Sequence, residues 1–97
     1  MEDKLKYIAL FDLYGDLLTE KQRNYFAESY FDDLSLSEMA ENYGISRNAV
    51  HKQIKDALHK LEWYEDILHL SLKKQKICAI IDKIKDKKIK EELKELL

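Results

Sequence analysis

The amino-acid sequence predicts an all-α protein with a helix-turn-helix head and a C-terminal helical arm, and three observations support this. The 97 residues include no proline and only 2 glycines, too few for the many turns of a β-sandwich or barrel. Apolar residues recur at spacings of three and four along most of the chain, as on the buried face of a helix. Thr19, Ser35 and Ser46 each precede such a stretch, in the position of a helix N-cap.

The first helix is expected over residues 4–14. Its apolar residues recur at helical spacing and predict the buried face: Leu5, Ile8, Leu10, Phe11 and Tyr14. Gly15 is expected to end the helix in the left-handed conformation, which glycine adopts at little cost.

The second helix is expected to begin at Thr19, because Thr19 and Gln22 form a capping box. Its predicted inner face holds an apolar and aromatic set: Tyr25, Phe26, Ser29 and Tyr30. The adjacent Asp32 and Asp33 are expected to end it in a loop.

Two further capped helices joined by a glycine turn predict a helix-turn-helix. Ser35 and Glu38 form a second capping box before a short helix that runs to about Asn42. Gly44 is expected to give the turn its positive φ, and Ser46 to cap the following helix. Met39 and Ala40 are expected to face inward, and Ile45 and Val50 to fill the wedge between the two helices.

The helix after Ser46 has the pattern of a recognition helix, whose first residues reach base edges in the DNA major groove. Arg47 suits guanine and Asn48 suits adenine. We predict four residues at base edges: Arg47, Asn48, His51 and Lys52. We predict six at phosphates, on this helix and at two other helix starts: Lys21, Gln22, Arg23, Ser35, Ser46 and Lys55. The predicted partner is therefore double-stranded DNA, and the alternative is a helix-turn-helix that serves only as a packing scaffold.

The charge is distributed unevenly along the chain. Residues 1–45 carry 4 basic and 10 acidic side chains, whereas residues 46–97 carry 13 basic and 9 acidic ones. The local balance decides affinity for phosphate more than the net charge of -2 does. The acidic first part is equally suited to a basic partner, so a protein- or RNA-binding accessory factor stays open as the second hypothesis.

The predicted division is a helix-turn-helix domain over residues 1–61 and a C-terminal arm over residues 62–97. Apolar residues continue at helical spacing in the arm, and Asp86 is placed to cap a separate last helix. These apolar faces need cover, either from the head or from a second copy. Because helix-turn-helix proteins commonly dimerise, we expect a homodimer formed through the C-terminal helices.

Three stretches of sequence closely resemble the YlxM family: LLTEKQRNY, DDLSLSEMAENYGISRNAV and LEWYE. The resemblance implies a fold like region 4 of sigma factors, a dimer, a DNA-binding regulatory role and an association with the signal recognition particle pathway. The family usually has glutamine at the position of Asn48, an acidic residue at Lys52 and a basic residue at Asp56. These departures lie on the outward face of the predicted recognition helix.

No enzyme, cofactor or metal site is expected. The single cysteine, Cys78, cannot form an intramolecular disulfide or a cysteine-based zinc cluster, and no glycine-rich phosphate loop is present. His51, His59 and His69 are too far apart in sequence to share one helical turn. Since the chain also has no long apolar run or leader, we expect a cytoplasmic protein without a membrane segment.

Overall fold

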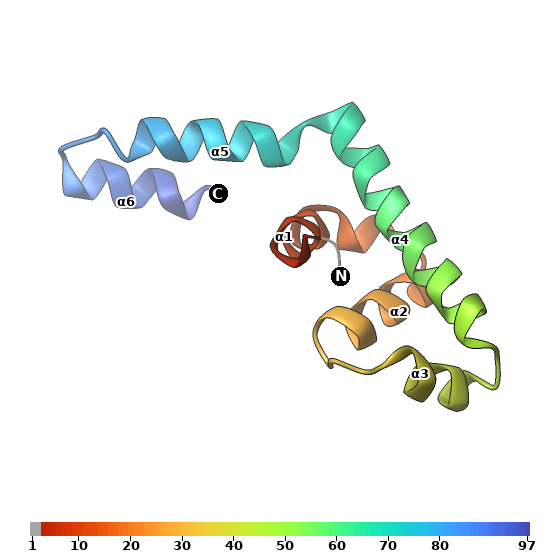
Figure 1. Ribbon diagram of the computed structural model, residues 1–97. Coiled ribbons are helices and arrows are strands. Elements are labelled where there is room, and N and C mark those ends of the chain that lie inside the picture. The colour runs from red at the N-terminus through yellow and green to blue at the C-terminus, as the bar shows by residue number, and fades with distance from the viewer. Residues whose placement is uncertain (1–2) are drawn as a thin grey trace.

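The computed structural model describes residues 3–97, and the regular structure in this range is helical (Figure 1). It comprises six α-helices and one short 3-10 turn, η1: α1 (Lys4–Tyr14), η1 (Gly15–Leu17), α2 (Glu20–Tyr30), α3 (Leu36–Tyr43), α4 (Arg47–Leu68), α5 (Leu70–Ile81) and α6 (Lys87–Glu95). The all-α prediction is confirmed.

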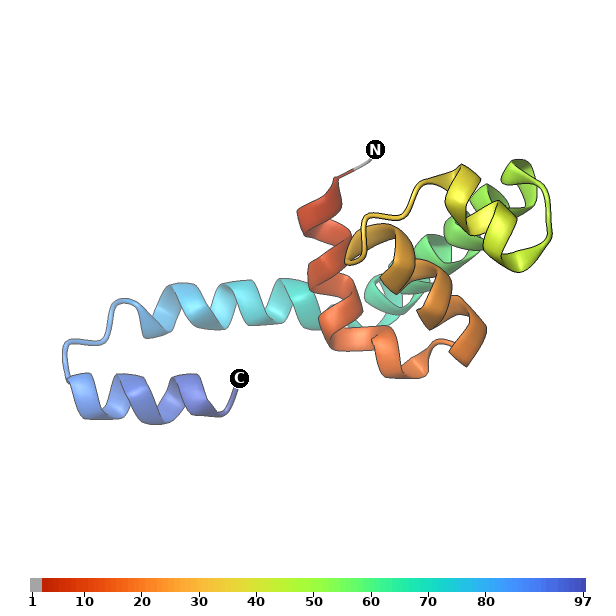
Figure 2. The ribbon, with the colours of Figure 1, turned by 90° about the horizontal axis from the view of Figure 1, so that it is seen from below.

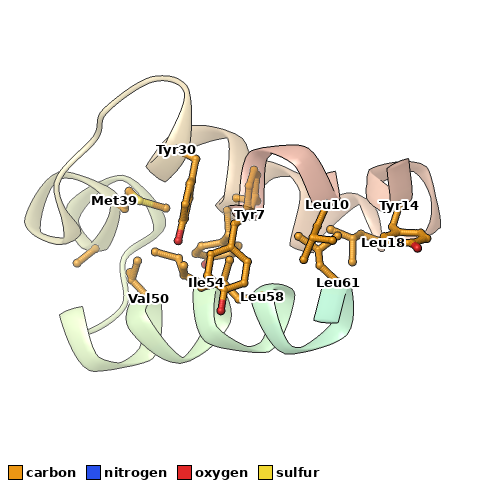
Figure 3. Packing of buried hydrophobic residues seen from close by; sticks show 13 residues of the cluster. Tyr7, Leu10, Tyr14, Leu18, Tyr30, Met39, Val50, Ile54, Leu58 and Leu61 are labelled. Atoms are coloured by element: carbon orange, nitrogen blue, oxygen red, sulfur yellow. The ribbon is translucent and has the colours of Figure 1, made fainter. Parts of the chain in front are cut away.

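The head consists of α1, α2 and α3 packed against α4, as Figure 3 shows for the buried side chains. Met39, Val50 and Leu61 are fully buried and come from α3 and the two ends of this packed stretch of α4. Phe26 of α2 stacks between Phe11 and Tyr30, with both pairs of ring centroids 4.4 Å apart. The core is therefore rich in aromatic rings and runs along one side of α4.

The three predicted N-caps are confirmed. The Thr19 and Ser35 side chains accept hydrogen bonds from the Gln22 and Glu38 N–H groups, each at 3.1 Å, and both capping boxes are complete. Ser46 Oγ accepts from the Ala49 N–H at 3.0 Å. Each cap satisfies an amide that the first turn of a helix leaves without a partner.

Three expectations about single residues are wrong. α1 ends before Gly15 as expected, but Gly15 has a right-handed φ of -56° and enters η1; a Cβ there would lie 3.1 Å from the Phe11 ring, so the ring would have to shift. Leu5 is 80% exposed, since Tyr7 takes the buried position on α1. Ile45 is 38% exposed, so the wedge between α3 and α4 is filled by Val50 without it.

Gly44 is the position where a positive φ is required, with φ 66° at the end of α3. No atom lies within 4 Å of the place that a Cβ would take, so a side chain would clash with no neighbour. The cost of a substitution is therefore the strain of a positive φ in the backbone. We expect Gly44→Ala to lower the free energy of unfolding by about 1–2 kcal/mol. Gly44→Asn is the control, and urea denaturation should show a smaller loss for it because asparagine tolerates this conformation. Equal losses for the two variants would contradict this explanation.

The arm is a helical hairpin that projects from the head (Figures 1 and 2). α4 runs without a break through the predicted division between residues 61 and 62 and ends at Leu68. His69, with φ 54°, turns the chain into α5, and α6 folds back along α5 after an N-cap by Asp86. The predicted cap at Asp86 is confirmed, while the division into two domains remains a prediction.

Candidate nucleic-acid interface

The helix-turn-helix is formed by α3, the turn at Gly44 and the first half of α4. The turn is closed by a hydrogen bond from the Ile45 N–H to the Ala40 carbonyl, 3.1 Å long. Met39 and Val50 are fully buried between the helices, and Ile54 and Leu58 continue the inner face of α4. The recognition helix is thereby held on one side and leaves the other side to solvent.

The residues predicted at base edges lie on that outer side. Arg47, Asn48, His51 and Lys52 are all exposed and fall within the first two turns of α4. Lys52 is held by Asp56, with Nζ 2.8 Å from the carboxylate, in an i,i+4 pair. Among residues 3–97 no ion pair occupies the Arg47 guanidinium. Arg47 is therefore the cation at the start of α4 that is available to an anion or a base edge.

A groove of about 500 Å³ runs beside this helix and collects three of the predicted residues: Ser35, His51 and Lys55. Tyr30, Ile54 and Leu58 also line it. Ser35 is largely committed to its capping box, since its N–H donates to Glu38 and its Oγ accepts from the Glu38 N–H, both at 3.1 Å. The Ser35 hydroxyl proton is the group left to meet a phosphate oxygen.

The other predicted phosphate contacts are not brought to this groove. Lys21 lines a separate hollow with Tyr25 and Tyr43, beside the last residue of α3, whereas the Ser35 groove lies at the first turn of α3. Gln22 uses its side-chain oxygen to accept from the Thr19 N–H at 3.0 Å. Arg23 is half-buried. The structure therefore places Ser35 and Lys21 at opposite ends of α3.

A tyrosine pair fastens α3 to α2 beside the Lys21 hollow. The Tyr25 and Tyr43 rings stack with centroids 4.6 Å apart, and the Tyr43 hydroxyl donates to the Glu28 carboxylate. This hydrogen bond, together with burial, raises the pKa of Tyr43 to about 12. Tyr43 therefore stays protonated at neutral pH and holds the end of α3 that leads into the recognition helix.

The junction between head and arm contains a hydrogen-bond network that was not predicted from the sequence. The Tyr14 hydroxyl donates to Glu65 Oε1 at 2.6 Å and accepts from the Leu70 N–H at 3.1 Å. Glu65 also accepts from the Ser71 N–H at 3.0 Å and the Leu72 N–H at 3.2 Å, so it caps α5 from the preceding helix. One carboxylate thus joins α1, α4 and α5.

The two ionisable groups of this junction have shifted pKa values. Burial alone would raise the pKa of Glu65, but the hydrogen bonds from Tyr14, Ser71 and Leu72 hold it below its ordinary value of 4.5. Burial, followed by the hydrogen bond to Glu65, raises the pKa of Tyr14 above 10.0. A buried tyrosine hydroxyl normally finds a partner, which is the signal in the sequence that could have pointed to a nearby acceptor.

Other chemistry has little support in the described part of the chain. Within residues 3–97, no three His, Cys, Asp or Glu side chains are arranged to hold a metal ion. His51, His59 and His69 are exposed on different turns of the structure, and Cys78 is half-buried. No helix in this range is both long enough and apolar enough to cross a membrane.

A family model and individual relatives both relate the chain to the same protein family. The model of the UPF0122 family, described as "helix-turn-helix protein, YlxM / p13 like", matches residues 1–97. A UPF0122 protein of Geobacillus kaustophilus is 44% identical over 86 residues, which are 89% of this chain and 78% of the relative. One from Halalkalibacterium halodurans is 43% identical over 86 residues, 89% of this chain and 79% of the relative. One from Bacillus thuringiensis is 43% identical over 93 residues, covering 91% and 84%.

Proposed function

The chain belongs to the YlxM/p13-like family of helix-turn-helix proteins, and on this basis we propose that it is a regulator that binds double-stranded DNA through the first turns of α4. One observation carries the proposal: the exposed side of the helix-turn-helix presents Arg47, Asn48 and His51 at the start of the recognition helix. This is the part of such a helix that enters the major groove. Arginine and asparagine are side chains that read guanine and adenine.

The phosphate contacts of this proposal come from two places. Ser35 and Lys55 line the groove beside α4, Ser46 caps the start of α4, and Lys21, Gln22 and Arg23 lie in the first turn of α2. Contacts on both sides of a recognition helix fix its position on the duplex without reading sequence. Lys52 acts as a base contact in this proposal only after it leaves Asp56.

We also propose that the protein acts as a homodimer through its arm and reads two half-sites, as helix-turn-helix dimers do. The exposed apolar side chains of α5 and α6, among them Ile80, which is 62% exposed, support self-association. The family resemblance further suggests a regulatory role in the signal recognition particle pathway, which would place the protein in the cytoplasm.

The test is a selection of bound fragments from sheared genomic DNA near physiological salt, with Arg47→Ala run beside the unmodified protein. We expect a short two-fold motif, and a loss of about 1–3 kcal/mol in specific binding for the variant, or about 5- to 150-fold. His59→Ala is the matched control, because His59 is also exposed on α4 but lies three turns further along. Equal affinity of the Arg47 variant for the motif and for random duplex would contradict the assignment.

The second hypothesis is an accessory factor of protein targeting whose acidic head docks on a basic protein or on a ribonucleoprotein, without sequence-specific DNA binding. It is supported by the excess of acidic residues in positions 1–45. Two acidic side chains of the head are already engaged within the chain, which weakens this hypothesis: Asp33 pairs with Lys4 at 3.3 Å, and Glu38 is used in a capping box. No enrichment of fragments by a folded protein would favour this hypothesis over DNA binding.

A further inference from the structure

The chain exposes more surface than a compact protein of its size. Its accessible surface is 6929 Å², whereas a compact monomer of this mass exposes about 5,800 Å². Its radius of gyration is 16.9 Å, against about 12.5 Å for a compact domain of this length. The excess of about 1,000 Å² per chain is close to the roughly 800 Å² that each partner buries in a stable interface. The area that a second chain would cover on this one is thus about as large as the excess of accessible surface.

One exposed face of α5 in the arm combines apolar side chains with lysines. Leu70, Lys73, Ile77 and Ile80 stand at i, i+3, i+7 and i+10 on α5. Lys76 is exposed three residues after Lys73 and four before Ile80, and we call these five residues the arm face. Its three apolar members are 42%, 43% and 62% exposed. All charged residues of α5 are lysines. In the adjoining hairpin, Asp82 is shared by Lys90 and Lys94 at 3.9 Å each, and Asp86 caps α6.

The head has a surface that also combines apolar with charged side chains, but its exposed charged residues Asp12 and Asp66 are acidic. Leu5, Ala9 and Asp12 stand at i, i+4 and i+7 on the exposed side of α1. Beside them a groove of about 440 Å³ runs between α1, the end of α4 and the start of α5, with Ala9, Leu10 and Leu72 as apolar lining. Its charged lining is mainly acidic, with Glu62, Glu65 and Asp66 against Lys6. We call Leu5, Ala9, Asp12 and Asp66 the head face. Asp12 and Asp66 are exposed, with no ion pair among the described residues.

We propose that the arm face of each chain docks on the head face of a second copy, so that two chains exchange arms around a two-fold axis. This deepens the self-association proposed above and rests on it. Charge favours arm-to-head contact, because two arm faces brought together would oppose lysine to lysine, whereas Lys73 and Lys76 meet Asp12 and Asp66 in the exchanged arrangement. A two-fold axis makes the two contacts identical and closes the assembly as a dimer.

The test uses charge reversal at both faces of the full chain. One variant carries Asp12→Lys and Asp66→Lys, and the other carries Lys73→Glu and Lys76→Glu. Sedimentation equilibrium at low salt should show that each variant alone has a dimer dissociation constant raised by about tenfold or more, since like charges then face each other. An equimolar mixture of the two variants should recover a dissociation constant within about threefold of the unmodified protein, because both contacts are again complementary.

Charge-matched controls separate this contact from an effect of net charge. Asp32→Lys with Glu41→Lys, and Lys87→Glu with Lys88→Glu, change the charge by the same amount at exposed positions outside the two faces. They should leave the dissociation constant within about threefold of the unmodified protein, and raised salt should weaken the unmodified dimer. Circular dichroism establishes that each variant is folded.

Three results would overturn the proposal in distinguishable ways. If the head-face variant dimerises as the unmodified protein does, the arms pair with each other and only the exchanged arrangement is wrong. If the unmodified protein is monomeric at high concentration, the self-association proposed above is wrong as well. If it is monomeric and the arm-face variant loses affinity for duplex DNA, the lysines of the arm serve nucleic acid and not a second chain.

Discussion

Replacing Phe26 by alanine is expected to lower the free energy of unfolding by about 3–5 kcal/mol, the usual cost of removing a buried phenylalanine. Phe26 is fully buried and stacks on Phe11 and Tyr30, which belong to two different helices. The stability of a protein of this length is about 5–15 kcal/mol. The variant should therefore be partly or wholly unfolded under mild conditions, as chemical denaturation followed by circular dichroism would show.

Phe31→Ala is the matched control for this prediction. Phe31 packs edge-on against two rings of this stack, with centroids 5.6 Å from Phe11 and 5.8 Å from Phe26, but it is 47% exposed. Its truncation leaves a site open to water instead of a closed cavity, and we expect a loss of about 1 kcal/mol. Similar losses for the two variants would show that the stacked triad is not the centre of the head.

Replacing Glu65 by alanine is expected to cost about 3 kcal/mol and to release the arm from the head. The change leaves the buried Tyr14 hydroxyl without its acceptor and removes the partners of the Ser71 and Leu72 N–H groups. Glu65→Gln retains one acceptor oxygen and should cost less. Hydrogen exchange at the first turn of α5 is the decisive measurement, and protection equal to that of the unmodified protein in Glu65→Ala would contradict the role given to this carboxylate.

The same junction predicts how stability depends on pH. Since the pKa of Glu65 is held below 4.5 in the folded chain, its contribution is present above pH 4.5 and is lost as the pH falls through the lowered value. The pKa of Tyr14 is raised, so its contribution is present below pH 10.0 and is lost as the pH rises through the raised value. Stability curves of the unmodified protein and Glu65→Gln should therefore converge on acidification.

The parts of the fold that were predicted correctly depend on short-range physics. Capping boxes at Thr19 and Ser35 and the left-handed turn at Gly44 involve residues three or four apart in sequence. The misassigned residues depend on neighbours distant in sequence or on the exact path of a helix. Gly15 lies only four residues after Phe11, but its conformation depends on the tightened turn η1 that follows α1. Leu5 is exposed because the buried stripe of α1 passes through Tyr7.

The same distinction between short-range and long-range contacts applies to the candidate site. The exposure of Arg47, Asn48 and His51 follows from helical spacing, and the pairing of Lys52 with Asp56 follows from their i,i+4 positions. The separation of Lys21 from Ser35 depends on how α2 and α3 cross, which no local pattern specifies. Likewise, Tyr14 and Glu65 are 51 residues apart and meet only in the folded chain.

The unbroken course of α4 has a mechanical consequence. Its 22 residues form a rod about 33 Å long, with the exposed Arg47, Asn48 and His51 at one end and the Glu65 junction at the other. A rigid rod converts any tilt imposed at its arm end into a displacement of Arg47 at the opposite end. In the dimer proposed above, the contact that holds the arm would therefore set the separation of the two recognition helices, and we expect that separation to match one turn of the duplex, about 34 Å.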